Sequence, residues 1–314
     1  MLSVRLTPFC TSAIWGGNKL KERYGKKADI DIAETWELSG YPGYESTVTS
    51  GVYAGKNLNE LVSVLGKGIL GKKGENSDKF PLLIKFIDAA APLSIQVHPN
   101  DEKAKQLGEY GGKTEMWIIC EADPGAYIYF GVNKELSPEL FASSIIDGSI
   151  TDHLNKIYVK PGDTFFIKSG TIHAICEGIT LCEIQQSSDV TYRLYDYKRK
   201  GKDGKERELH IEKGKVASEL IPPSHFYEEG TPFGDGMKMV ECEYFTTTVY
   251  TIDGEKKAFV NDESFASFTV TEGEGSLSTG EEKYSVKKGD TIMVFAGAGD
   301  VTLSGKTNVV CATL

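Results

Sequence analysis

Short apolar or alternating runs, separated by Gly, Pro, Asn and Asp, recur along much of the chain. Runs of this length with this punctuation predict β-strands rather than helices. We expect strands near residues 82–86, 93–97, 116–119, 126–130, 157–159, 164–167 and 181–184. The hydrophobic pattern therefore predicts a mainly β protein.

Helical spacing of apolar residues is confined to fewer segments. Residues 57–65 have apolar residues at helical spacing and begin with Asn57, a candidate N-cap. Residues 137–146 begin with Ser137, which a proline follows. Both are start signals of helices. Residues 99–107 form a shorter third candidate. We expect these helices to be additions to a β fold.

The chain contains an internal repeat. Residues 158–173 and 284–300 share Gly-Asp-Thr, three apolar residues, two variable positions and a Gly. Each copy predicts a turn, a strand and a second turn, as in a jelly-roll barrel. Asp300 stands in the second copy where the first has His173. We expect a domain over residues 1–222 and, after Pro222 and Pro223, a smaller structural β-barrel over residues 223–314.

Composition narrows the class of protein. The 314 residues are 40% hydrophobic and 25% charged, as in ordinary globular proteins, and their net charge of −10 disfavours nucleic acid and anionic membranes as partners. No apolar run approaches the roughly 18 residues of a membrane span, and no signal-peptide pattern opens the chain. Six scattered cysteines without a C-x-x-C pair indicate reduced thiols. We expect a cytoplasmic protein, and the sequence makes no prediction of its oligomeric state.

Four residues form a candidate ligand set for one divalent metal. Gln96 and His98 lie two apart on an apolar strand, so their side chains share a face, and a strand end follows at once. Glu115 opens the next strand and His173 follows a Gly-containing turn. Each is unremarkable alone, but together two imidazoles, a carboxylate and an amide suit zinc with an open coordination position.

Several segments resemble the type I mannose-6-phosphate isomerases, a zinc-dependent cupin family. The resemblance rests on residues 11–17, 33–39, 81–101, 112–117, 161–173 and 186–196. It implies a cupin-type jelly-roll barrel with helical additions, and one zinc ion per chain held by Gln96, His98, Glu115 and His173. One departure is Tyr41, which stands where many members have His. The short distance from Glu115 to His173 matches the compact bacterial form.

The resemblance also implies a reaction, the interconversion of mannose 6-phosphate and fructose 6-phosphate through a cis-enediol. Lys85 and Lys113 are the candidate bases, although either could instead pair with phosphate or a carboxylate. Arg193 matches the family's catalytic arginine, and its planar fork suits a pair of enediolate oxygens. Ser94 is a candidate phosphate donor, as Lys113 also is. Glu37 and Asp189 are weaker polar candidates.

The sequence also allows two other functions. One is a different sugar-phosphate isomerase, for instance one that acts on glucose 6-phosphate, and the other is a cupin that binds metal or sugar without turnover. Lys85, Lys113 and Arg193 speak against the second, because a binding protein needs no reactive groups beside the metal. The basic segment from Lys198 to Lys215, which includes Lys202, is either a solvated loop or a wall beside a phosphate site.

Overall fold

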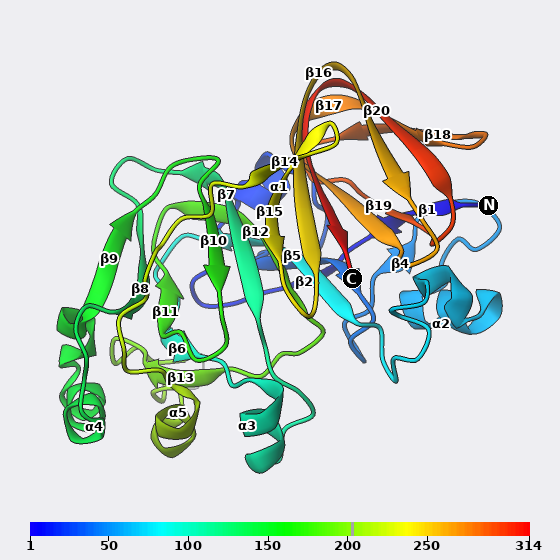
Figure 1. Ribbon diagram of the computed structural model, residues 1–314. Helices are drawn as coiled ribbons and strands as arrows, with labels where there is room; N and C mark the ends of the chain where they lie inside the picture. Colours follow the sequence, from blue (N-terminus) through cyan, green and yellow to red (C-terminus); the bar gives the residue numbers. More distant parts are fainter. Residues whose placement is uncertain (202–203) are drawn as a thin grey trace.

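We describe the fold from a computed structural model that covers residues 1–201 and 204–314. Within these residues the strands form three antiparallel sheets, so the prediction of a mainly β protein is confirmed. Figure 1 shows the C-terminal strands at one side of the molecule and the strands of the central third of the chain at the other. No helix of the described residues is long and apolar enough to span a bilayer.

The first two sheets lie face to face. The six-stranded sheet has the order β10-β7-β12-β5-β3-β2, and the five-stranded sheet has the order β13-β6-β11-β8-β9. Both are open at their edges, so the jelly roll is a sandwich rather than a closed barrel. The strands are β2 (Phe9–Thr11), β3 (Glu34–Ser39), β5 (Leu82–Ala89), β6 (Ile95–Val97), β7 (Glu115–Ala122), β8 (Tyr127–Val132), β9 (Leu154–Tyr158), β10 (Thr164–Ile167), β11 (His173–Ile175), β12 (Ile179–Gln186) and β13 (Tyr192–Tyr195).

The third sheet mixes the two ends of the chain. Its order is β14-β15-β16-β20-β17-β19-β1-β4, with β18 paired to β17. Its strands are β1 (Ser3–Thr7), β4 (Thr47–Val48), β14 (Thr231–Phe233), β15 (Gly236–Glu241), β16 (Thr246–Val260), β17 (Ala266–Thr279), β18 (Glu282–Lys287), β19 (Thr291–Val294) and β20 (Gly299–Thr313). Strand β1 thus pairs with β19, almost the full chain away (Figure 1). The domain boundary after residue 222 stays a prediction. Strands β1 and β4 precede this boundary in the sequence but belong to the sheet that the C-terminal strands form.

The buried side chains form four clusters in the described chain, one of which lies within the C-terminal sheet. Another joins the six-stranded sheet, through Phe86 and Met116, to the C-terminal sheet, through Met293 and Val310. A third fills the space between the six- and five-stranded sheets, and the fourth lies between the five-stranded sheet and the helices. Alternation along β7 makes this possible, because Met116 and Trp117 face opposite layers.

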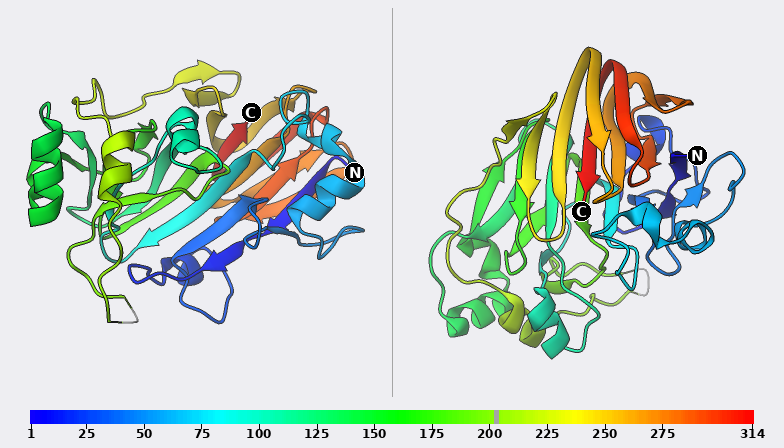
Figure 2. Two further views of the ribbon diagram at one scale, coloured as in Figure 1. Left: turned by 90° about the horizontal axis from the view of Figure 1, so that it is seen from below. Right: turned by 45° about the vertical axis from the view of Figure 1, so that its right-hand side comes forward.

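The helices are short and lie at the periphery. They are α1 (Lys19–Glu22), α2 (Leu58–Leu65), α3 (Asp101–Gln106), α4 (Pro138–Asp147) and α5 (Ile211–Ala217), with 3₁₀ turns η1 (Lys67–Leu70) and η2 (Ser149–His153). Figures 1 and 2 show α3, α4 and α5 gathered at one end of the molecule. All three predicted helices are confirmed. Asn57 forms a reciprocal capping box with Glu60, and Ser137 accepts the amide hydrogen of Leu140.

The structure confirms the internal repeat down to its turn. Gly162 and Gly289 have positive φ angles of 93° and 92°, a conformation that favours glycine. The aspartate that follows each glycine accepts an amide hydrogen three residues back, at 2.9 Å in the first copy and 3.0 Å in the second. Strands β10 and β19 then occupy equivalent places. The two copies therefore share one local structure although they lie in different sheets.

The capping box of α2 yields a stability prediction. Asn57→Ala removes the side-chain acceptor of the Glu60 amide and should lower the free energy of unfolding by about 1 kcal/mol. Ser63→Ala in the same helix is the matched control, because Ser63 is exposed. Urea unfolding of both variants measures the difference, and equal stabilities would contradict the prediction.

Candidate metal centre

Three side chains from separate parts of the sequence meet between the six- and five-stranded sheets. His98 follows β6, Glu115 opens β7 and His173 opens β11. One ligand atom of each lies within 4.8 Å of the others. His98 is 1% exposed, and Glu115 and His173 are fully buried. The structure therefore brings together three of the four residues that the sequence predicts as metal ligands.

Gln96, the fourth predicted ligand, lies directly opposite His173 in the pairing of β6 with β11. Its amide nitrogen is 3.4 Å from Nε2 of His173. A half-turn of the amide group exchanges its nitrogen for its oxygen, so the same side chain can present an oxygen donor at this place. Gln96 is thus positioned to complete the set.

Backbone carbonyls orient both imidazoles. The oxygen of Val190 lies 2.8 Å from Nδ1 of His98, and the oxygen of Thr171 lies 2.8 Å from Nδ1 of His173. A carbonyl can only accept, so each Nδ1 carries the hydrogen and each Nε2 keeps its lone pair. Both Nε2 atoms point toward Glu115, at 3.6 Å from Oε2 and 3.4 Å from Oε1. This is the outer-shell arrangement typical of metal-binding histidines.

The carboxylate of Glu115 is the anionic centre of the cluster. Both of its oxygens are buried without a well-aligned hydrogen bond, although the ammonium of Lys113 lies 2.6 Å from Oε2. A buried carboxylate with unsatisfied lone pairs is costly unless a cation completes its environment. The residues present therefore fit a divalent metal bound by two neutral imidazoles, one carboxylate and one amide oxygen.

The environment also sets the protonation states. Burial, together with the positive charge of Lys113, lowers the pKa of His98 well below its usual range. Burial lowers the pKa of His173 to about 4. Both imidazoles are then neutral at pH 7, as metal binding requires. Burial alone would lower the pKa of Lys113, but Glu115 and Glu183 outweigh it and raise that pKa. The surrounding carboxylates thus favour the charged form of Lys113.

A second charged cluster adjoins the first. Lys85 is buried on β5, with its ammonium 3.5 Å from Glu34, 3.8 Å from Glu183 and 4.3 Å from the ring centre of Trp36. Glu183 also lies 3.7 Å from Lys113. The two predicted lysines are therefore joined through one carboxylate.

Glu183 is a site residue that the sequence interpretation missed. It is 2% exposed, and its Oε2 accepts the indole hydrogen of Trp117 at 3.0 Å. In the ladders of β12 it lies opposite both Lys85 and Trp117. Burial and the neighbouring Glu115 raise the pKa of its carboxyl group. The available signal was a charged residue inside the otherwise apolar strand of residues 181–184, which is uncommon unless the charge is paired.

Arg193 lies on β13 opposite Gln96. Its Nη1 donates to the carbonyl of Glu208 at 2.9 Å, while its Nε is buried without a partner among the described residues. Burial, aided by Arg207, lowers the pKa of Arg193. Arg193 therefore has one guanidinium hydrogen without a partner in the described chain, on a strand that pairs with the strand of Gln96.

Ser94 and the basic segment lie at the start of the ligand strand. Ser94 comes directly before β6 and is 4% exposed, and its hydroxyl group has no hydrogen-bond partner in the described chain. Arg199 donates to the carbonyl of Pro92 at 2.6 Å, and Asp196 holds both Arg199 and Arg207. The basic segment is therefore anchored beside Ser94 rather than fully solvated. Lys202 lies outside the described residues.

Glu37 and Asp189, the two weaker polar candidates, lie in different parts of the fold. Glu37 is fully buried in an ion pair with Lys26, 2.5 Å long, and accepts from Thr291 of the C-terminal sheet at 3.4 Å. It therefore belongs to the packing between sheets and not to the metal cluster. Asp189 is exposed, and its charge interacts with those of Lys85 and Lys113.

Two family models match the chain. Residues 3–134 match the catalytic domain of phosphomannose isomerase type I. Residues 236–314 match the cupin domain of mannose-6-phosphate isomerase. The matches include Gln96, His98 and Glu115 but leave His173 and Arg193 between them.

Individual proteins resemble the chain over its whole length. Mannose-6-phosphate isomerase ManA of Bacillus subtilis is 37% identical over 98% of this chain and 97% of its own. The crystal structure of a mannose 6-phosphate isomerase from Bacillus subtilis superimposes with a TM-score of 0.91, at 34% identity and full coverage of both chains. A zinc-bound mannose 6-phosphate isomerase shares the fold, with a TM-score of 0.81 at 18% identity over 99% of both chains.

The geometry predicts the consequence of removing one imidazole. His173→Ala takes one of the two neutral nitrogen donors from the cluster and should lower zinc affinity by a factor of 100 or more, on the order expected for loss of a direct ligand. His225→Ala is the control, because His225 is exposed and its partners among the described residues, Glu228 and Ser224, lie outside the cluster. Zinc content after dialysis against a competing chelator measures both. Retention of zinc by His173→Ala would remove it from the ligand set.

Proposed function

This chain belongs to the type I mannose-6-phosphate isomerase family, and on that premise we propose that the cluster around Glu115 is its catalytic centre. Its activity is the interconversion of mannose 6-phosphate, an aldose, and fructose 6-phosphate, a ketose. The observation that carries the assignment of the site is the convergence of His98, Glu115 and His173, fully buried between two sheets. An isomerase that acts on glucose 6-phosphate and a cupin without turnover are not favoured.

The reaction moves a proton between C2 and C1 while negative charge develops on O1 and O2 of the sugar. One zinc ion per chain, held by Gln96, His98, Glu115 and His173, would supply Lewis-acid stabilisation of that charge. Two observations support zinc over other ions. The donors are imidazole nitrogens and carboxylate and amide oxygens, and a protein of the same fold has been solved with zinc bound.

Lys113 and Lys85 are proposed to handle the proton. Lys113 lies 2.6 Å from Glu115 and 3.4 Å from Nε2 of His98, so it is the cation nearest to the ligands. Lys85 lies farther along the sheet, and Glu183 is within 3.8 Å of both lysines. This carboxylate holds the two ammonium groups at one face of the site. It thereby keeps the two side-chain nitrogens in position, so that a lysine in its neutral form can take a proton from a sugar carbon and in its charged form can return it.

We propose that Arg193 binds the end of the substrate at which the enediolate forms, and that Ser94 binds the phosphate end. The free Nε hydrogen of Arg193, opposite Gln96, is placed for an oxygen of the enediolate. Ser94 has a free hydroxyl, and Arg199 is fixed two residues away at the carbonyl of Pro92. A hydroxyl beside an anchored arginine suits a phosphate group, which defines the other end of the sugar.

We also propose that the chain divides into two domains after residue 222. All the proposed catalytic, substrate-binding and metal-binding residues precede residue 222. The described part of the chain contains one cluster of His, Cys, Asp and Glu side chains able to hold a metal, and it lies in the first region. The second region then acts as a structural partner of the first.

Removal of the metal tests the proposed chemistry. Dialysis against a strong chelator should abolish turnover of mannose 6-phosphate, because charge on O1 and O2 is then no longer stabilised. Added zinc should restore it. A coupled assay with mannose 6-phosphate and, separately, glucose 6-phosphate measures both activity and substrate choice. Activity that the chelator does not change would contradict the metal mechanism. A preference for glucose 6-phosphate would contradict the assignment of mannose 6-phosphate as the substrate.

Arg193 can be tested apart from the metal. Arg193→Ala should keep zinc but lower kcat roughly 100-fold or more, as does removal of a donor to a developing negative charge. Arg23→Ala removes an equal charge from an exposed residue that pairs with Glu121, and its kcat should not change. Zinc content and steady-state rates decide the outcome. Full turnover by Arg193→Ala would exclude its proposed role.

A further inference from the structure

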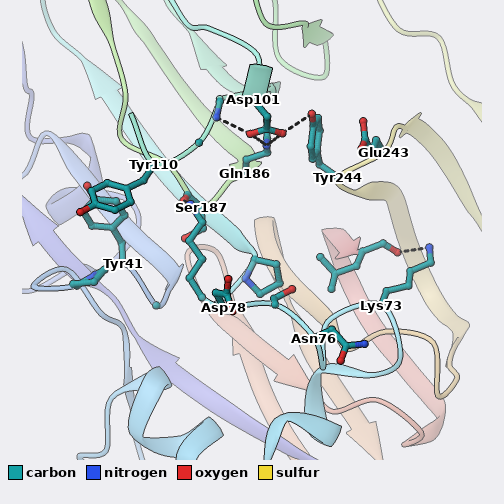
Figure 3. Close-up of a pocket in the computed structure, with 18 residues that line it drawn as sticks. Tyr41, Lys73, Asn76, Asp78, Asp101, Tyr110, Gln186, Ser187, Glu243 and Tyr244 are labelled. Carbon is teal, nitrogen blue, oxygen red and sulfur yellow. Dashed lines mark hydrogen bonds between the residues drawn. The ribbon is translucent and has the colours of Figure 1, made fainter. Parts of the chain in front are cut away.

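A large groove lies beside the metal centre without containing any of its ligands. It encloses about 1300 Å³ and is lined from both sides of the predicted domain division, for instance by Gly112 and Gln186 on one side and Glu243 and Tyr244 on the other. Figure 3 shows Asp101 at one end of the groove, between Gln186 and Tyr244. The groove wall is therefore a place where the C-terminal region touches the catalytic region.

Asp101 is a hydrogen-bond hub in this wall. Its Oδ1 accepts the amide hydrogen of Gly112 at 2.7 Å, and its Oδ2 accepts the hydroxyl hydrogen of Tyr244 at 2.8 Å (Figure 3). The side-chain nitrogen of Gln186 lies 3.4 Å and 3.3 Å from the two oxygens. One carboxylate thus fixes helix α3, the segment before β7, the end of β12 and the C-terminal sheet.

The same hub fastens the segment that carries Lys113 and Glu115. Asp101 holds Gly112, the residue immediately before Lys113, while the amide of Lys113 donates to the carbonyl of Pro99 at 2.9 Å. The amide of Thr114 donates to Oε1 of Gln186 at 2.8 Å. Gly112 is therefore tied to Asp101 itself, Lys113 to Pro99 two residues before it, and Thr114 to Gln186, which also contacts the Asp101 carboxylate.

Close packing adds to these bonds. A side-chain carbon at Gly112 would come within 2.5 Å of the backbone carbon of Asn100 and 2.6 Å of the backbone nitrogen of Asp101. The chain that leaves His98 and the chain that approaches Glu115 thus touch backbone to backbone. The contact of Gly112 with Asn100 and Asp101 therefore fixes the position of Glu115 relative to His98, and the position of Lys113 between them.

We propose that Asp101 and Tyr244 are positioning residues of the isomerase, through which the C-terminal region sets the place of Lys113. The inference rests on the proposed function. Neither residue belongs to the ligand cluster, and Tyr244 comes from the turn between β15 and β16. Its hydroxyl hydrogen bond prevents the Asp101 carboxylate from turning away from Gly112. A small displacement of a group that acts on the reacting atoms lowers the rate more than it weakens substrate binding.

Tyr244→Phe tests the link, because it removes one hydroxyl and leaves the ring. We expect kcat for mannose 6-phosphate to fall about 3- to 10-fold, the range of coupling through such contacts, with KM and zinc content unchanged. Hydrogen exchange of the peptide that contains residues 110–116 should become faster. Tyr110→Phe is the matched control, since Tyr110 lines the same groove and its hydroxyl has no partner among the described residues.

Asp101→Ala and the double variant complete the design. If Tyr244 acts through Asp101, the double variant should have the kcat of Asp101→Ala alone. The proposal is overturned if Tyr244→Phe keeps the kcat and exchange rates of Tyr110→Phe. It is equally overturned if kcat falls only in proportion to lost zinc or lost folded protein, or if the two variants are additive. An inactive wild-type protein would instead contradict the proposed function.

Discussion

A carboxylate without contact with water must be surrounded by positive charge or by hydrogen-bond donors, and Glu115 imposes this condition on the whole site. Its two oxygens face the ammonium of Lys113 and the unprotonated Nε2 atoms of His98 and His173, whose lone pairs need the same cation that the carboxylate does. These partners come from both sheets of the sandwich, so the sandwich cannot open without exposing an unpaired buried charge. The two carbonyls that hold the imidazoles extend the same constraint to the loops beside the strands.

The charges beyond Glu115 alternate across one face of the six-stranded sheet. Glu115, Glu183, Lys85 and Glu34 come from β7, β12, β5 and β3, which are successive strands of that sheet, and Lys113 precedes β7. Two indoles complete the row, because Trp117 donates to Glu183 and Trp36 donates to Glu34. A sheet face of this kind places the ammonium group of Lys85 on a strand and that of Lys113 two residues before the start of one.

The internal repeat shows how one local structure serves two purposes. Both copies use a glycine with positive φ and an aspartate that caps the turn before a short strand. Only the first copy ends in a histidine, and only there do two sheets bring further donors to meet it. The second copy pairs with β1 and β17, in the same sheet as β15 and β16, between which Tyr244 lies. The two copies therefore differ in the proposed ligand, His173, and not in the local backbone structure.

Local signals in the sequence determined the helix starts at Asn57 and Ser137, the repeated turn, the strand of residues 164–167 and the shared face of Gln96 and His98. These features depend on neighbours within a few residues, so a single sequence contains them. The resemblance to a family suggested the role that we propose for Arg193. Only the tertiary structure decided that β1 joins the C-terminal sheet, that Glu183 links Lys85 to Lys113, and that Tyr244 reaches Asp101. The alternation of a strand fixes which face a side chain takes, but the residue it meets depends on pairing between distant segments, which no local pattern specifies.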